Sequence, residues 1–123
     1  MFSDLQKYPS LIKAVFRYEH RSQTELDQFK AHLSLVDGSQ LRLNEVWIDG
    51  RLTKYSYYWL TPTGTLIAGW DSAPHHPHID SFPHHRHTPD GVVRSSVRSL
   101  TDLLNLLTTL LLPDDEELTP PTP

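Results

Sequence analysis

The sequence contains no cysteine. This absence excludes disulfide bonds, a thiol nucleophile and every cysteine-ligated zinc or iron–sulfur site. The sequence also lacks an apolar run of the roughly 18 residues that a membrane-spanning helix needs, and its N-terminus does not have the pattern of a secretion signal. We therefore expect a cytoplasmic protein that has no membrane partner.

Residues 1–112, which are most of the chain, also lack a formal net charge. The formal net charge is −4, and the acidic residues at positions 114–117 supply all of it, because residues 1–112 contain equal numbers of basic and acidic side chains. A strongly basic nucleic-acid-binding domain is therefore not indicated. Any contact with RNA has to be local and to use a limited part of the surface.

The length of 123 residues is typical of one domain. Apolar side chains alternate along residues 29–35 and 41–47, on either side of Asp37-Gly38, which is a strong hairpin signal. Asp49-Gly50 predicts a second hairpin. We expect an antiparallel meander of four or five strands between about residues 11 and 71, with a polar stretch at 22–28.

Two further segments complete the expected fold. Prolines at four positions between Ala73 and Pro89 predict a loop there, because proline disfavours a helix and a central strand. Val92–Val93 predicts a short strand that closes the sheet. Ser99 is a candidate N-cap for a helix that Pro113 ends, with leucines at helical spacing.

These elements predict an α+β fold. We expect a twisted antiparallel β-meander with a C-terminal α-helix packed on one face and a His/Pro-rich loop at the sheet edge. Residues 1–112 form the single domain, and residues 113–123 form a disordered, acidic, proline-rich tail. Leu103, Leu107 and Leu111 should face the sheet. Leu106 and Leu110 then lie on a second apolar face, a candidate surface for a homodimer or another partner.

Histidine is the unusual component. The sequence contains eight histidines, and six of them fall between positions 75 and 87. They form two blocks, Trp70-Asp71-Ser72-Ala73-Pro74-His75-His76-Pro77-His78 and Phe82-Pro83-His84-His85-Arg86-His87. These blocks, after the hairpin pattern, resemble the TumE family over about residues 8–112. The resemblance implies a small cytoplasmic α+β toxin of a bacterial toxin–antitoxin pair, whose partner is a helix-turn-helix antitoxin.

The histidines themselves leave three chemistries open. In the first, two imidazoles act as general base and general acid on an RNA phosphodiester, as in a ribonuclease, because histidine titrates near neutral pH. RNA supplies its own 2′-hydroxyl nucleophile, so neither cysteine nor a metal is required. We expect the two blocks to converge in space, and the candidate catalytic histidines are His75, His76, His84, His85 and His87.

The second chemistry is metal binding, and the third is structural. Neutral imidazoles with a carboxylate suit a divalent ion such as zinc or nickel, and the candidate ligands are His78, His87 and Asp71. This alternative corresponds to a non-enzymatic module that binds a metal or a protein through the same loop. In the third interpretation, the histidines form a polar surface loop that packs on neighbouring aromatic rings.

Glu45 is a further candidate, because it stands on an apolar stripe and a carboxylate there needs a partner. The Asp49-Gly50 turn predicts that it lies opposite Lys54 and forms an ion pair. The alternative is a catalytic role in which Glu45 orients a histidine. The candidate substrate-binding residues are Arg86, Lys54, Tyr55 and Asp71. Arg42 is a second candidate for neutralising a phosphate, although Arg86 lies inside the histidine cluster.

Overall fold

The computed structural model describes residues 1–113. In chain order, its elements are α1 (Phe2–Leu5), β1 (Ile12–Gln23), β2 (Leu26–Leu35), β3 (Gln40–Ile48), β4 (Arg51–Leu60), β5 (Leu66–Asp71), β6 (His85–Thr88), β7 (Gly91–Arg94) and α2 (Leu100–Leu111). Apart from Pro113, the predicted tail lies outside the described residues.

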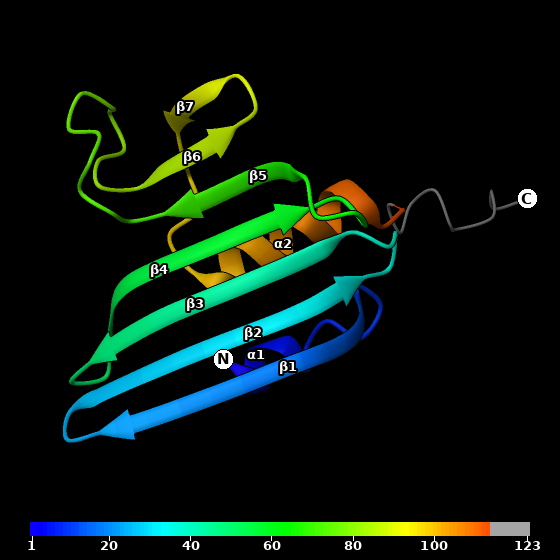
Figure 1. Cartoon of the computed structure of the whole chain (residues 1–123), viewed down its shortest axis with the longest axis horizontal. Helices are drawn as coiled ribbons and strands as arrows, with labels where there is room; N and C mark the ends of the chain where they lie inside the picture. Colours follow the sequence, from blue (N-terminus) through cyan, green and yellow to red (C-terminus); the bar gives the residue numbers. More distant parts are fainter. Residues whose placement is uncertain (114–123) are drawn as a thin grey trace, which may run out of the picture.

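The strands form one antiparallel sheet in which each strand pairs with its neighbours in the sequence, in the order β1 to β7. Both helices lie against the same face of this sheet, as Figure 1 shows, and the other face carries no helix. The α+β meander predicted from the sequence is therefore confirmed: residues 11–71 contain five strands, β7 includes the strand expected at Val92–Val93, and only β6 was not foreseen. We call the helix-covered side the core face and the other side the open face.

The core face is made of the alternating apolar residues that the sequence pattern predicted. Leucines of β2 and β3 are buried there together with Leu103 and Leu107 of α2. The Ser99 side chain accepts a hydrogen bond from the Asp102 backbone N–H and so caps this helix. Leu111 is partly buried against the core, as is Leu106, whereas Leu110 keeps 57% of its surface exposed.

The tight turns follow from residues that accept a positive φ. Asp49 and Gly50 have φ values of 52° and 74°, as the predicted two-residue hairpin requires. A similar turn was not foreseen in the polar stretch 22–28. There β1 continues to Gln23 and β2 begins at Leu26, with Glu25 at a φ of 65°. The first hairpin is therefore longer than the apolar pattern indicated.

One part of the predicted loop is a strand. We expected residues 73–89 to contain no strand, but β6 lies between β5 and β7 and pairs with both. The physical reason is the placement of the prolines. Pro83 precedes the strand and Pro89 follows it, so the missing N–H groups fall outside the ladder.

The predicted pairing of Glu45 with Lys54 is wrong. Glu45 lies opposite Tyr55, and Val46 lies opposite Lys54, because the register shifts between Val46 and Trp47. A bulge adds one residue to β4 at this point, so that each later residue faces a partner one position away. Since side chains alternate between faces, this shift separates the Glu45 and Lys54 side chains onto opposite faces of the sheet.

Candidate functional site

The strand register gathers polar side chains into two rows across the open face. Directly paired residues of an antiparallel sheet point to the same face, so a chain of pairs defines a row. The first row, from β1 to β6, is Arg17, His32, Arg42, Tyr58, Gly69 and His87. The second row, from β1 to β6, is Glu19, Lys30, Asn44, Ser56, Asp71 and His85.

Both rows end in one cluster of ionisable side chains. His85 Nε2 lies 2.8 Å from Asp71 Oδ1, and His87 Nε2 lies 2.9 Å from Asp71 Oδ2. The two Nε2 atoms are 3.0 Å apart. Asp71 and His85 are buried, and His87 is half-buried, so one side of the cluster is accessible. We call these three residues the Asp–His–His cluster.

His76 brings the first histidine block to this cluster. Its ring centroid lies 4.8 Å from that of His85 and 6.1 Å from that of His87. Partial desolvation and the neighbouring imidazoles, His85 foremost, lower the pKa of His76. The expected convergence of the two blocks is therefore confirmed for three rings.

The backbone fixes the orientation of two members of the cluster. Asp71 Oδ1 accepts a hydrogen bond of 3.0 Å from the Ala73 backbone N–H. His85 Nδ1 donates one of 3.0 Å to the Pro83 carbonyl oxygen, because a carbonyl can only accept. Such second partners hold a carboxylate and an imidazole in fixed directions, which a catalytic or metal-binding group requires.

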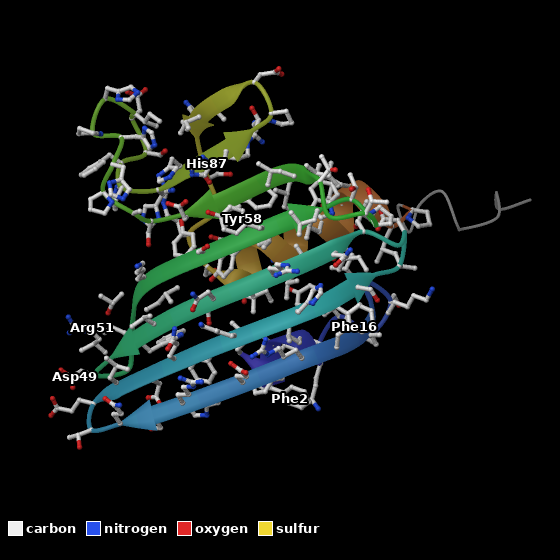
Figure 2. All side chains as sticks on the ribbon, viewed as in Figure 1. Phe2, Phe16, Asp49, Arg51, Tyr58 and His87 are labelled. Carbon is white, nitrogen blue, oxygen red and sulfur yellow. The ribbon has the colours of Figure 1, made fainter. Side chains whose placement is uncertain are left out.

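A groove lies over the basic part of the open face, on strands β1 to β4. Its volume is about 340 Å³, and its lining includes Arg17, Lys30, His32, Arg42 and Tyr58. The Tyr58 ring covers Gly69, where an added Cβ would stand 2.6 Å from Tyr58 Cδ1 and 3.7 Å from the Cβ of His87. Figure 2 shows Tyr58 and His87 on this face. Tyr58 therefore connects the groove with the Asp–His–His cluster.

His84 and Tyr55, two candidate site residues, lie apart from this cluster. The Tyr55 hydroxyl donates to the Val97 carbonyl oxygen at 3.0 Å and accepts from His84 Nδ1 at 2.7 Å. Burial raises the pKa of Tyr55 to about 12, while burial and then the positive charge of Arg98 lower the pKa of His84. Tyr55 is on the core face, so this pair faces away from the groove.

Glu45 is also on the core face. It is 2% exposed, and it accepts hydrogen bonds from the Tyr57 hydroxyl and from Trp47 Nε1. Burial, and next the charge of Glu45, raise the pKa of Tyr57, so its hydroxyl stays protonated and donates. The structure thus gives Glu45 neutral donors as partners instead of a histidine.

The remaining candidates divide between the two faces. Arg86 pairs with the buried Trp70 and so projects from the core-face side of β6, whereas Arg42 projects from the open face. Lys54 is exposed on the open face. His75 and His78 are exposed in the loop, where the His78 ring lies 5.8 Å from that of His76.

Among the described residues, the group whose geometry could hold a metal ion differs from the predicted one by a single residue. It consists of Asp71, His85 and His87, whose ligand atoms all lie within 4.8 Å of one another. His85 therefore takes the place that the sequence analysis gave to His78. The reason is the unforeseen strand β6, which places two histidines two residues apart on one face.

Sequence reasoning missed the contribution of the open face. The sequence analysis attached no role to Tyr58. The available signal was the alternation of Tyr55, Tyr57 and Trp59 with Tyr58, because it predicts that three rings enter the core and one does not. The relation of Tyr58 to Gly69 and His87 depends on the strand register.

Comparison with known protein families identifies a match over most of the chain. The family model described as Toxin TumE matches residues 2–111 of the chain. A comparison with curated proteins found no match, and neither did a comparison with solved structures. Among residues 1–113, no helix has the length and apolar character needed to cross a membrane.

Proposed function

Because the chain belongs to the TumE toxin family, we propose that it arrests bacterial growth by cleaving RNA at the Asp–His–His cluster. One observation carries this proposal: the register places the cluster at the end of the rows that hold Arg42, Lys30 and Tyr58. A site for charge or proton chemistry and a surface suited to a polyanion therefore share one face.

The groove has the side chains that bind single-stranded RNA. Arg42 carries a positive charge that attracts phosphates, and Lys30 adds a second charge on the neighbouring row, whereas Arg17 is paired with Glu19. Tyr58 offers a ring on which an unpaired base can stack, as sheet surfaces do in other RNA-binding folds. An RNA strand that crosses β3 and β4 in this groove brings a phosphodiester to the cluster.

The proposed reaction uses the nucleophile that RNA supplies. The 2′-oxygen attacks the adjacent phosphorus and loses its proton, the bond from phosphorus to the 5′-oxygen breaks, and the 5′-oxygen takes up a proton. The products are a 2′,3′-cyclic phosphate and a 5′-hydroxyl end. The Asp–His–His cluster stabilises the developing charge, and His76, whose ring lies beside the cluster, accepts or supplies protons at the reacting phosphate.

The toxin role implies a protein partner. We place the toxin in the cytoplasm with a helix-turn-helix antitoxin, and we assign partner binding, including formation of a homodimer, to the α2 surface around Leu106 and Leu110. The exposure of Leu110, at 57%, supports this assignment. Expression of the chain with and without a neighbouring helix-turn-helix gene tests whether such an antitoxin is the partner, because the antitoxin should restore growth.

The RNA-cleavage test uses two arginines as a matched pair. Arg42 and Arg86 are both exposed, but only Arg42 lies on the open face. With purified full-length protein and a labelled single-stranded RNA, we expect Arg42→Ala to weaken RNA binding by about 5–10-fold and to reduce its salt dependence. Arg86→Ala should bind and cleave as the unchanged protein does.

A DNA strand of the same sequence provides the chemical control. It should bind in the groove but remain intact, because it has no 2′-hydroxyl. Equal losses of RNA binding in Arg42→Ala and Arg86→Ala would contradict the assignment of the open face. Cleavage of the DNA strand, or RNA products without a cyclic phosphate, would contradict the proposed reaction.

A further inference from the structure

Three atoms of the Asp–His–His cluster that carry lone pairs lie close together, and such contacts need a proton or a cation between the atoms. His85 Nε2 lies 2.8 Å from a carboxylate oxygen of Asp71 and 3.0 Å from His87 Nε2. His85 Nδ1 already donates its hydrogen to the Pro83 carbonyl. In a neutral His85 the Nε2 atom therefore carries a lone pair, which points at the Asp71 carboxylate.

His87 cannot resolve this conflict alone. One hydrogen on His87 Nε2 can be donated to Asp71 or to His85, at 2.9 and 3.0 Å. The contact between the His85 lone pair and the Asp71 oxygen still needs a positive charge between the two atoms. That charge is either an additional proton or a metal cation.

The arrangement of the three residues favours a cation. Asp71 and His85 face each other across β5 and β6, and His87 follows on the same face of β6. The ligand atoms therefore approach from one side and form a triangle. Two histidines and one carboxylate in this arrangement leave coordination positions free for water or substrate. The half-buried side of His87 is where those positions open.

From this geometry we infer that Asp71, His85 and His87 bind one divalent transition-metal ion. Two imidazole nitrogens and one carboxylate oxygen suit Zn²⁺, Mn²⁺, Fe²⁺, Co²⁺ or Ni²⁺, whereas Mg²⁺ prefers oxygen ligands. The Ala73 N–H and the Pro83 carbonyl provide the outer partners that orient such ligands. His76, whose ring packs on His85, is positioned beside the ion.

The role of the ion rests on the proposed function. A divalent cation at this end of the groove neutralises the negative charge on the non-bridging oxygens of a phosphodiester held by Arg42 and Tyr58. Ion binding itself is a property of the three ligands and does not require RNA. The two statements can therefore be tested separately.

The first experiment measures metal binding without RNA. Full-length protein is dialysed against a chelator and titrated at neutral pH with Zn²⁺, Mn²⁺ and Mg²⁺ by calorimetry. We expect one Zn²⁺ per chain and no measurable binding of Mg²⁺. His87→Ala should lower the Zn²⁺ affinity by at least about 100-fold, because it removes a direct ligand.

The matched control is a loop variant that keeps the cluster. The double variant His75→Ala, His78→Ala removes two exposed imidazoles, and we expect it to bind one Zn²⁺ with unchanged affinity. Asp71→Asn keeps the shape of the side chain and gives a second test if His87→Ala fails to fold. Circular dichroism identifies the folded variants. The absorption bands of bound Co²⁺ then report whether nitrogen ligands are lost in each of them.

Defined outcomes decide the inference. The proposed metal site is overturned if the unchanged protein binds no Zn²⁺. It is also overturned if folded His87→Ala and Asp71→Asn both bind Zn²⁺ as tightly as the unchanged protein does, or if only the loop variant loses the ion. In those cases the shared charge is a proton. If the ion binds as expected and RNA stays intact with it, the metal site stands and the proposed ribonuclease function fails. If the ion binds but RNA is cleaved equally after chelation, the function and the metal site stand and the role of the ion in cleavage fails.

Discussion

The two faces of the sheet each hold a buried carboxylate, and the comparison between them separates a structural group from the group proposed to be functional. Glu45 on the core face receives hydrogen bonds from a phenol and an indole, which are neutral donors. Asp71 on the open face contacts two imidazole nitrogens and a backbone N–H. Burial is similar, at 2% and 8% exposure, so burial alone does not distinguish the two sites.

The partners make the difference. The donors around Glu45 satisfy its charge, and nothing further is needed from a ligand or solvent. The partners of Asp71 bring lone pairs of their own, so the site needs a proton or a cation to be satisfied. A carboxylate that faces other metal-binding atoms beside an accessible groove is therefore the better candidate for chemistry.

The largest expected effect concerns Asp71. Asp71→Asn keeps the size of the side chain but removes its charge, so we expect RNA cleavage to fall by about 10²–10⁴-fold. The free energy of unfolding should change by less than about 1.5 kcal/mol, because the amide can still accept the Ala73 hydrogen bond. Cleavage assays and urea unfolding measure the two quantities. A large loss of stability with normal activity would make Asp71 the structural group.

The reverse is expected for Glu45. Glu45→Ala leaves the Tyr57 hydroxyl and Trp47 Nε1 without their acceptor in the core, and we expect a loss of about 3 kcal/mol in the free energy of unfolding. The cleavage rate per folded molecule should remain unchanged. Glu45→Gln, which retains an acceptor, serves as the control and should recover part of the stability. A loss of cleavage activity in Glu45→Gln without a loss of stability would show that Glu45 contributes to the reaction.

The core face should also respond to alkaline pH. The pKa of Tyr55 is about 12 in the folded protein and about 10 in the unfolded chain. Its contribution to stability is therefore complete below pH 10 and is lost as the pH rises from about 10 to about 12. Urea unfolding at several pH values measures this loss, and Tyr55→Phe should show a smaller decline in the same window. An identical decline in both proteins would assign it to other groups.

The smallest expected effect is the coupling between Gly69 and Tyr58 on the open face. Gly69→Ala places a methyl group against the Tyr58 ring, and we expect it to displace the ring and to weaken RNA binding. In the Tyr58→Ala background the same substitution meets no ring, so its effect on binding should disappear. A double-mutant cycle in RNA affinity, with a coupling of about 1 kcal/mol, measures this. Additive effects would show that the ring does not contact the RNA.

The elements with local signals were predicted from the sequence. The Asp49-Gly50 hairpin and the Ser99-capped helix depend on residues within a few positions of one another, and both are present as expected. Leu103 and Leu107 pack on the sheet because helical spacing directs them to one side. The convergence of the two histidine blocks was also predictable, since a short proline-restricted segment joins them.

The site was predicted less completely, for identifiable reasons. Because prolines flank β6, the sequence predicted a loop there, although both prolines lie outside the hydrogen-bonded ladder of the strand. One bulge in β4 shifts the register, so that Glu45 and Lys54, which were expected to pair, lie on opposite faces of the sheet. Arg86 is adjacent to the histidines in the sequence, but the alternation of side chains places it on the other face. Arg42 lies on β3, three strands away from the histidines of β6, and yet it shares the open face with them.

The sequence by itself determined most of the strands and the C-terminal helix, where most of the chain turns, and that six of the histidines lie close together in the chain. These properties depend on alternation, turn residues and capping, which act over a few residues. Only the tertiary structure decided which histidines meet Asp71 and which one packs on Tyr55. The physical reason is that strand register and bulges assign each side chain to a face, and they are set by pairing between distant segments.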